Sequence, residues 1–321
     1  MRGRGAPRGV RACGGRGVSA RTGVGAWLEL MRIGNAPTVV SNVFAGMAVG
    51  LQARLADIPV PLGTGAVLVA GTVLTYVAGM ILNDAFDAQA DARERPSRPI
   101  PSGRIGIAGA RFVGLLTLAV GAAMLAVSGE GTPWWAVLLA GSVVLYNAIH
   151  AWFPGAFVVM AACRAIVPVI AARAVSPGAD GALLGWVAGG AFAYVAALGL
   201  VARNEVQGLP PVARAVRWTL PIAACAPLGV WLAEGVGPES AVTVTLGLVS
   251  MASAVVGVVT GVRLAASSGA HAVPAAVGTW LGVIPLIDAA TCFLLGRPLL
   301  GLLCVAMFGL SGALRPRFAA S

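Results

Sequence analysis

Long apolar stretches alternate with short polar breaks along almost the whole chain. Each stretch is near the roughly 20 residues that a helix needs to cross the hydrocarbon core of a bilayer. The last two stretches adjoin, so they form either a tight hairpin or one bent element. The pattern predicts an all-α polytopic membrane protein with nine or ten transmembrane helices. The stretches cover residues 27–52, 62–83, 107–128, 133–151, 154–174, 181–203, 215–234, 240–265, 276–295 and 297–314.

The composition agrees with this pattern and argues against a soluble globular protein. Apolar residues make up 58% of the chain, charged residues make up 11%, and the mean hydropathy is +0.87. The net charge of +10 does not indicate nucleic-acid binding, because the arginines lie at stretch ends and near the N-terminus. Residues 1–25 are rich in Arg and Gly and predict a disordered tail. We expect residues 26–321 to form one transmembrane domain.

Arginine placement predicts the orientation, because cytoplasmic loops of membrane proteins carry an excess of Lys and Arg. With the N-terminus in the cytoplasm, eleven arginines lie on that side and three on the other. We therefore expect an integral protein of a bacterial inner membrane. The cytoplasmic set is Arg93, Arg95, Arg98, Arg104, Arg111, Arg203, Arg214, Arg217, Arg263, Arg315 and Arg317, and the opposite set is Arg54, Arg173 and Arg297.

The most polar run follows the second apolar stretch. Asp84, Asp87 and Asp91 are spaced i, i+3 and i+7, so on a helix they share one face. Three carboxylates at the end of a transmembrane helix are costly unless something binds them. A metal with a polyanion meets this need, because Mg²⁺ takes carboxylates together with substrate phosphates and arginines hold phosphate oxygens. The alternative is a solvated helix end with weak ion pairs.

Two further loops on the predicted cytoplasmic side carry polar residues. A site assembled from all three loops would offer another carboxylate, Glu205, to the metal and the apolar bundle beneath to a hydrocarbon tail. His150 is a lone histidine at the membrane interface, and we assign it no role. The polar residues are Tyr146, Asn147 and His150 after the fourth stretch, and Arg203, Asn204 and Glu205 after the sixth.

Three polar side chains fall inside the apolar stretches. Asn42 lies in the first stretch, Arg164 in the fifth and Asp288 in the ninth. An ionisable group within a membrane span indicates function by default, so we predict that Arg164 contacts substrate. We predict the same for Asn42. The alternatives are a hydrogen bond between helices for Asn42 and neutralisation of a buried carboxylate for Arg164.

The motif Asn83-Asp84-x-x-Asp87-x-x-x-Asp91, followed by Arg98-Pro99-Ile100-Pro101-Ser102-Gly103, resembles the first Asp-rich motif of the UbiA superfamily of intramembrane prenyltransferases. Arg32-Ile-Gly-Asn35-Ala-Pro37 is similar to the first helix of that family. Tyr146-Asn147 and Cys163-Arg164 are similar to its fourth-to-fifth helix region. The second motif of the family usually supplies two or more Asp residues, whereas this chain offers only Glu205 there. That pattern resembles the EboC-like subgroup.

The resemblance implies a UbiA-like bundle that transfers a prenyl group from a prenyl diphosphate to an aromatic or hydroxyl acceptor with Mg²⁺. Asp84, Asp87 and Asp91 would then be catalytic and, with Glu205, would hold the metal. One rival function is a membrane binding or scaffold protein that kept the fold but lost turnover. Another is an unrelated small-solute transporter. The implied substrate-binding residues are Asn83, Arg98, Asn42, Tyr146, Asn147, Arg164, Arg203 and Asn204.

Overall fold

The computed structural model describes residues 23–53, 60, 62–202, 218–234, 240–266 and 272–318, and all regular structure in these ranges is helical. The helices are α1 (Gly23–Leu30), the short 3-10 helix η1 (Ile33–Asn35), α2 (Ala36–Gln52), α3 (Leu62–Phe86), α4 (Ala88–Glu94), α5 (Ile107–Ala126), α6 (Pro133–Ile149), α7 (Ala156–Val175), α8 (Gly181–Ala202), α10 (Thr219–Ala224), α11 (Ala226–Glu234), α12 (Ala241–Ala266), α13 (Ala272–Leu294) and α14 (Pro298–Phe318).

Seven helices in the described ranges are long and apolar enough to cross a membrane: α3, α5, α7, α8, α12, α13 and α14. Two shorter apolar helices cover Pro133–Ile149 and Thr219–Ala233. The chain is therefore a multi-pass membrane protein, and the count of nine or ten spans stays a prediction. The last two apolar stretches form a hairpin of α13 and α14, because Gly296 between them adopts φ +66° and turns the chain.

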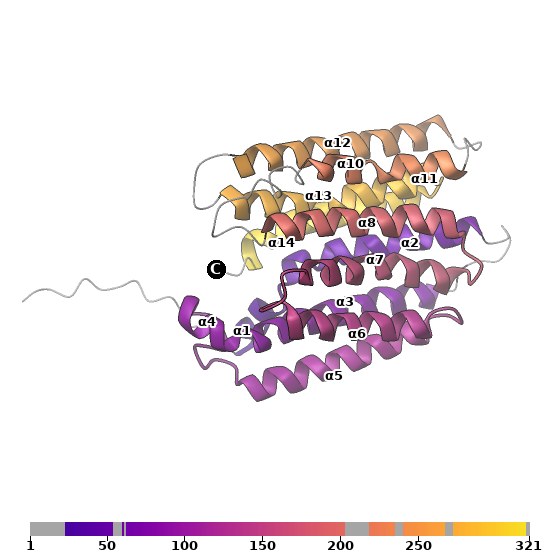
Figure 1. The fold of residues 1–321 in the computed structure, drawn as a ribbon. Coiled ribbons are helices and arrows are strands. Elements are labelled where there is room, and N and C mark those ends of the chain that lie inside the picture. Colours follow the sequence, from indigo (N-terminus) through magenta and orange to yellow (C-terminus); the bar gives the residue numbers. More distant parts are fainter. Residues whose placement is uncertain are drawn as a thin grey trace, which may run out of the picture.

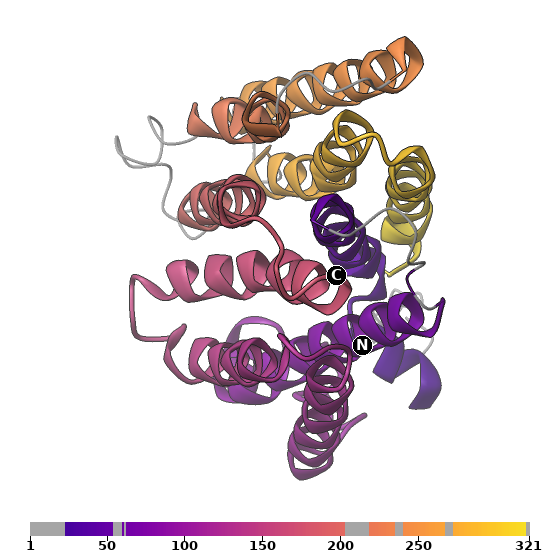
Figure 2. The same ribbon diagram turned by 90° about the vertical axis from the view of Figure 1, so that its right-hand side faces the viewer.

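Helix α2 lies at the centre of the bundle, where it contacts α3, α7, α8, α13 and α14 (Figures 1 and 2). Gly46 and Gly50 lie on its face toward α7. A Cβ on Gly50 would lie 2.6 Å from the Ala172 carbonyl oxygen, so the two backbones are closer than any larger residue allows. Small residues spaced by four permit such contacts between membrane helices.

Two predicted stretches are each broken into separate helices. The first breaks at Arg32, a non-glycine residue with φ +45°, and Pro37 then occupies the first turn of α2. The seventh breaks at Cys225 between α10 and α11, because Pro227 has no N–H to donate to the preceding turn. Helix α1 begins at Gly23, inside the predicted tail, and the rest of that tail lies outside the described residues.

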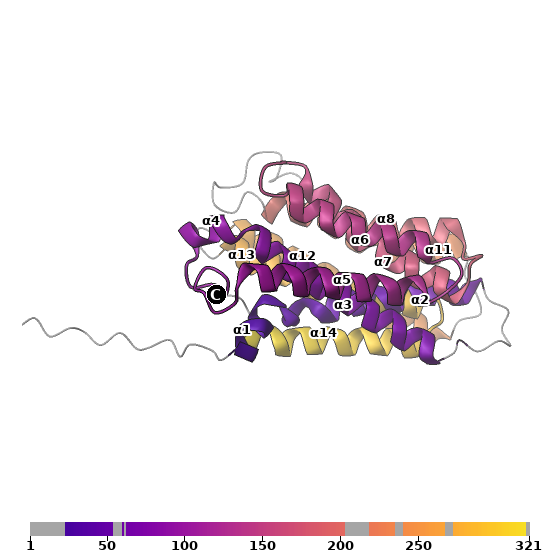
Figure 3. The ribbon, with the colours of Figure 1, turned by 90° about the horizontal axis from the view of Figure 1, so that it is seen from below.

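The C-terminal end of α3, helix α4 and helix α1 lie at one end of the bundle (Figure 1). We call this end the motif end. Helix α14 packs against α13, α2 and η1 and runs along one side of the bundle (Figure 3). Helices α5 and α12 lie on the outside of the bundle, and they expose large apolar side chains such as Phe112 on α5 and Val256 on α12. An exposed apolar outer face suits contact with lipid. The buried polar side chains of the motif end contrast with this apolar surface.

Candidate functional site

The three predicted carboxylates lie together at the motif end. Asp84 is in the last turn of α3, Asp87 is the residue between α3 and α4, and Asp91 is in α4. The Asp87 N–H donates to the Asn83 carbonyl and the Asp91 N–H to the Asp87 carbonyl, each at 2.9 Å. Helical hydrogen bonding thus continues through the junction and keeps the predicted spacing.

Two arginines bind these carboxylates. Arg32 Nη2 lies 2.8 Å from Asp84 Oδ1, and Arg98 Nη1 lies 2.6 Å from Asp91 Oδ2 and 3.6 Å from Asp84 Oδ1. The Asp84 and Asp91 side chains are each only 8% exposed, and Arg98 is 10% exposed. The ion pairs of the alternative interpretation are present. The pairs of Arg98 are buried on both sides, so the weakness of solvated pairs does not apply to them, whereas Arg32 is partly exposed.

His150 completes this cluster from α6. Its Nε2 lies 2.8 Å from Asp87 Oδ1 and 3.3 Å from Asn83 Nδ2, and its Nδ1 lies 3.1 Å from the Asn147 carbonyl. The hydrogen bond with Asp87 raises the pKa of the imidazole above its ordinary value. Tyr146 stacks on the ring with centroids 5.2 Å apart. We assigned no role to His150, but the structure places it in the carboxylate cluster; the i, i+4 spacing from Tyr146 was the available signal.

Arg32 is a second residue that the predicted site set omitted. Its φ and ψ are both 45°, a left-handed conformation that is strained for a residue with a Cβ. The Tyr76 hydroxyl donates to the Arg32 carbonyl at 3.0 Å and holds this conformation. The bend turns α1 away from α2 and places the Arg32 guanidinium on Asp84.

A chamber of about 580 Å³ opens beside the carboxylate cluster. Its lining comes from α2, α3, α6, α7, α8 and α13 and is mainly apolar. Arg32, Asn83 and His150 lie at its motif end, and Thr72 lies eleven residues before Asn83 on α3. At the helical rise per residue this separation is about 16 Å. The chamber therefore reaches from the carboxylates well into the membrane-spanning part of the bundle.

The structure brings most of the described substrate-binding candidates to this chamber. Asn83, Tyr146, Asn147 and Arg164 all line it. Arg98 does not line it and instead pairs with the carboxylates. The three predicted residues of the last loop, Arg203, Asn204 and Glu205, lie outside the described residues.

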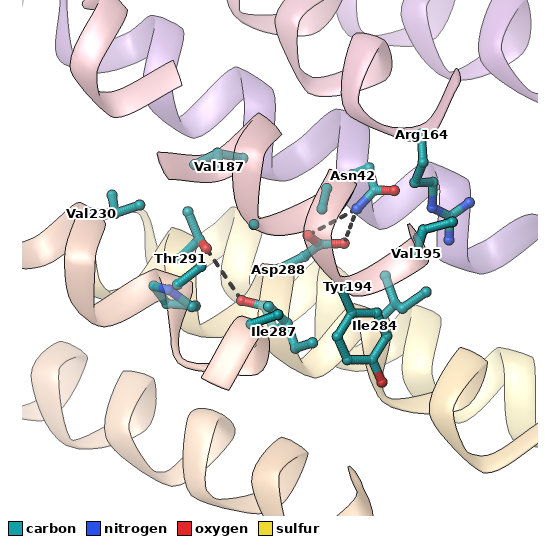
Figure 4. A pocket seen from close by; sticks show the side chains of 15 residues that line it. Asn42, Arg164, Val187, Tyr194, Val195, Val230, Ile284, Ile287, Asp288 and Thr291 are labelled. Atoms are coloured by element: carbon teal, nitrogen blue, oxygen red, sulfur yellow. Dashed lines mark hydrogen bonds between the residues drawn. The ribbon is translucent and has the colours of Figure 1, made fainter. Parts of the chain in front are cut away.

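Asn42, which we predicted to contact substrate, lies away from the chamber. It lines a separate cavity of about 30 Å³ and not the chamber. Its Nδ2 donates to both carboxylate oxygens of Asp288, at 3.0 and 2.8 Å (Figure 4). The alternative of a hydrogen bond between helices therefore describes Asn42, because this contact joins α2 to α13.

The carboxylate cluster could give a metal ion one or two oxygen ligands, but it does not form a complete coordination shell from protein side chains. No group of three or more His, Cys, Asp or Glu converges as a metal site in the part of the chain that the structure describes. Mg²⁺ usually takes only one or two carboxylates and completes its shell with water and substrate phosphates. Asp84 and Asp87, next to each other on one helical path, fit that mode of binding.

The comparison with protein families decides the assignment. The sequence profile of the UbiA prenyltransferase family matches residues 39–283, more than half of the chain. The chain belongs to the UbiA prenyltransferase family. The matched residues include α3, α4, α6 and α7, which supply the carboxylate cluster and much of the chamber of this UbiA protein. The similarity to the EboC-like subgroup stays a prediction.

Two relatives of this UbiA protein share one function name. A digeranylgeranylglyceryl phosphate synthase from Sulfurisphaera tokodaii is 36% identical over 100 residues, covering 30% of this chain and 34% of the relative. The synthase of that name from Methanopyrus kandleri is 36% identical over 132 residues, covering 40% and 43%. The matched segments thus span less than half of either relative.

Two solved structures resemble this UbiA protein. A UbiA homologue from Aeropyrum pernix K1 aligns with a TM-score of 0.64 over 79% of this chain and 96% of that chain. A structure of digeranylgeranylglyceryl phosphate synthase aligns with a TM-score of 0.58 over 86% and 99%. Both are 16% identical to this chain, so the likeness concerns the fold. The prediction of an all-α UbiA-like bundle is confirmed.

Proposed function

We propose that this protein transfers a prenyl group from a prenyl diphosphate to an aromatic or hydroxyl acceptor inside the membrane. The observation that carries the proposal is the placement of Asp84 and Asp87 beside the motif end of a mainly apolar chamber of about 580 Å³. A polyanionic head with a long apolar tail is the ligand that such a chamber fits. The two relatives are named as synthases of digeranylgeranylglyceryl phosphate, a prenylated glyceryl phosphate, and that name supports the same reaction class.

Different residues of the chain would carry out different parts of the reaction. Asp84 and Asp87 would hold Mg²⁺, which supplies positive charge to the diphosphate when it is bound. Arg32 and Arg98 would turn from the carboxylates to phosphate oxygens as the ligand enters, and their charge stabilises the leaving diphosphate as the C–O bond breaks. The chamber walls exclude water from the allylic cation. The acceptor then forms the new bond to carbon and releases a proton.

Glu205 remains our proposed additional metal ligand, and Arg203 and Asn204 our proposed substrate contacts, in the third loop. Their support is that α8 ends at Ala202, which lines the chamber. Only one carboxylate is present in this loop segment. A binding or scaffold protein is therefore the second candidate function, favoured by the pairing of Asp84 and Asp91 with arginines.

Purified protein in nanodiscs tests the proposal. The protein is given Mg²⁺, labelled geranylgeranyl diphosphate and a panel of hydroxyl and aromatic acceptors, with the Asp87→Ala variant as the inactive reference. We expect a lipophilic prenylated product and pyrophosphate from wild type and from the control variant named below, and neither from Asp87→Ala. Binding of the diphosphate without either product would reject prenyl transfer and favour the scaffold function. Asp180→Asn is the matched control, because Asp180 caps α8 through the Ala182 and Leu183 N–H groups and Asn caps equally well.

We also infer that the motif end faces the cytoplasm. The arginines near the motif end, including Arg93, Arg95, Arg98 and Arg104, support this orientation. Arg173 lies at the C-terminal end of α7, away from Ala156 at its start.

A further inference from the structure

Arg164 places a positive charge deep inside the bundle. It is the ninth residue of α7, which starts at Ala156, so it lies about 12 Å along the helix from that end. A guanidinium at such a depth is costly in a membrane protein unless it has a partner or lines a polar cavity. The carboxylate cluster at the motif end does not contact it in the described part of the chain.

Among the described residues, Asp288 attracts this charge through space, but no carboxylate contacts it directly. Arg164 Nη2 donates to Thr38 Oγ1 at 2.6 Å, and Arg164 Nε is buried with no hydrogen-bond partner. No ion pair of Arg164 is present within the described ranges. A guanidinium has five N–H donors in a planar fork, so most of its binding capacity is unused.

The buried acid in the same region is already bound by other groups. Asp288 accepts a hydrogen bond of 2.5 Å from Ser41 and two from Asn42. In Figure 4 the Asn42 amide lies between the Asp288 carboxylate and the Arg164 guanidinium. The expectation that Arg164 neutralises a buried carboxylate is therefore not met by a direct contact with Asp288.

Arg164 also lines the large chamber, together with Thr38, Thr75 and Tyr76. Its position differs from that of Asn83 and His150, which belong to the carboxylate cluster at the motif end. Arg164 thus adds to the chamber a charged side chain that contacts none of the three carboxylates, and Tyr76 lies between it and Arg32 in the polar lining.

We infer that Arg164 binds an anionic group, a carboxylate or a phosphate, of the acceptor. This inference rests on the proposed prenyl transfer, since the carboxylates and their metal would hold the diphosphate of the donor at the motif end. An anion at Arg164 would accept from the unused N–H donors in a charge-assisted, bidentate contact. It would also fix the acceptor in the chamber, so that Arg164 selects anionic acceptors over neutral ones of the same shape.

Equilibrium binding in nanodiscs of zwitterionic lipid, without donor, tests the inference independently of turnover. One probe pair is geranylgeranylglyceryl phosphate and geranylgeranylglycerol; the other is 4-hydroxybenzoate and 4-hydroxybenzamide. We expect wild type to prefer the anion of at least one pair by about tenfold or more, and Arg164→Gln to lose that preference. Arg173→Gln is the matched control, since Arg173 is on the same helix but lines neither cavity.

The donor is the other possible source of the anion, so its affinity is measured separately with Mg²⁺ and geranylgeranyl thiolodiphosphate. Unchanged donor affinity in Arg164→Gln supports the acceptor assignment, and an equal loss for donor and acceptor overturns it. No anion preference in wild type, or a preference that survives in Arg164→Gln, also overturns it. If Arg164→Gln fails to fold, Arg164→Lys decides the matter. It should keep a weakened preference, because an ammonium keeps the charge without the fork, and an undiminished preference contradicts the inference.

Absence of product with every acceptor, while the anion preference depends on Arg164, would reject prenyl transfer and leave an anion-binding chamber. Normal turnover with no role for Arg164 in acceptor binding would support prenyl transfer and reject the inference about Arg164. The two failures are therefore distinguishable.

Discussion

At the scale of single residues, Arg98 is the group on which two buried carboxylates depend. Its Nη1 serves both Asp91 and Asp84, and all three side chains are nearly enclosed. Removing one partner of a buried ion pair leaves an uncompensated charge in the interior, which is more damaging than losing a surface pair.

We expect Arg98→Ala to lower the free energy of unfolding by about 3–5 kcal/mol. Thermal unfolding in detergent checks this value. Arg95→Ala is the control, because Arg95 is exposed and makes no ion pair among the described residues. Equal stability of the Arg98→Ala and Arg95→Ala variants would show that the buried pairs contribute nothing.

Asp87 differs from its two neighbours because its partner is His150 and not an arginine. A carboxylate whose side chain is 25% exposed is accessible to an incoming metal–diphosphate complex. We expect Asp87→Ala to weaken Mg²⁺-dependent binding of geranylgeranyl diphosphate by at least about 10- to 100-fold, because losing even an outer-shell partner of a metal ligand usually costs that much. Calorimetry at saturating Mg²⁺ measures this, and wild-type affinity in the variant would remove Asp87 from the site.

At the scale of elements, the contact of α2 with α7 fixes the middle of the bundle. A Cβ on Gly46 would meet the Pro168 carbonyl oxygen and would lie 2.7 Å from Pro168 Cα. Backbone atoms cannot move aside as a flexible side chain can, so the two helices would have to separate. That separation would displace Thr38 on α2 from Arg164 on α7.

We therefore expect Gly46→Val to destabilise the protein by about 1–3 kcal/mol, the usual range for overpacking a core. Gly141→Ala is the matched control within another helix, because a Cβ there meets nothing within 4 Å. That control should be neutral or stabilising, since Ala favours helix more than Gly by about 1 kcal/mol. A Gly46→Val variant as stable as the Gly141→Ala variant would argue against the close α2–α7 contact.

At the scale of the whole molecule, six helices enclose the chamber and set its length. Thr72 is a small buried residue on its wall, far along α3 from Asn83. A larger side chain there shortens the space for a hydrocarbon tail without touching the carboxylates.

We expect Thr72→Phe to shift the preference from longer to shorter prenyl diphosphates by about tenfold or more, as steric changes in apolar pockets do. Competition between geranyl and geranylgeranyl diphosphate gives the ratio. Leu116→Phe is the control, because Leu116 lies 53% exposed on the outer face of α5. The same shift in both variants would mean that Thr72 does not limit the tail.

The orientation of the molecule has its own test. Ala90 on α4 is exposed at the motif end. In a background without native cysteines, Ala90→Cys should react with a membrane-impermeant maleimide in inverted vesicles and not in intact cells. Labelling of intact cells would place the motif end outside the cytoplasm.

The sequence alone determined the membrane class, the approximate spans and the carboxylate motif. Each is a local property: a helix in lipid must satisfy its own backbone hydrogen bonds and remain apolar over its length, and the i, i+3, i+7 spacing is set within one segment. The breaks at Arg32 and Cys225 were missed, because hydropathy averaged over a span is insensitive to one turn of backbone.

Only the tertiary structure decided which polar side chains share a cavity. Asn42 and Thr38 are one helical turn apart on α2, yet Thr38 lines the chamber and Asn42 lines the small cavity beside Asp288. His150 reaches Asp87 only because α6 ends next to the end of α3. Such assignments depend on the rotation and close approach of packed helices, which the small residues between them permit. Local sequence sets which residues are polar, and packing between distant segments sets what they face.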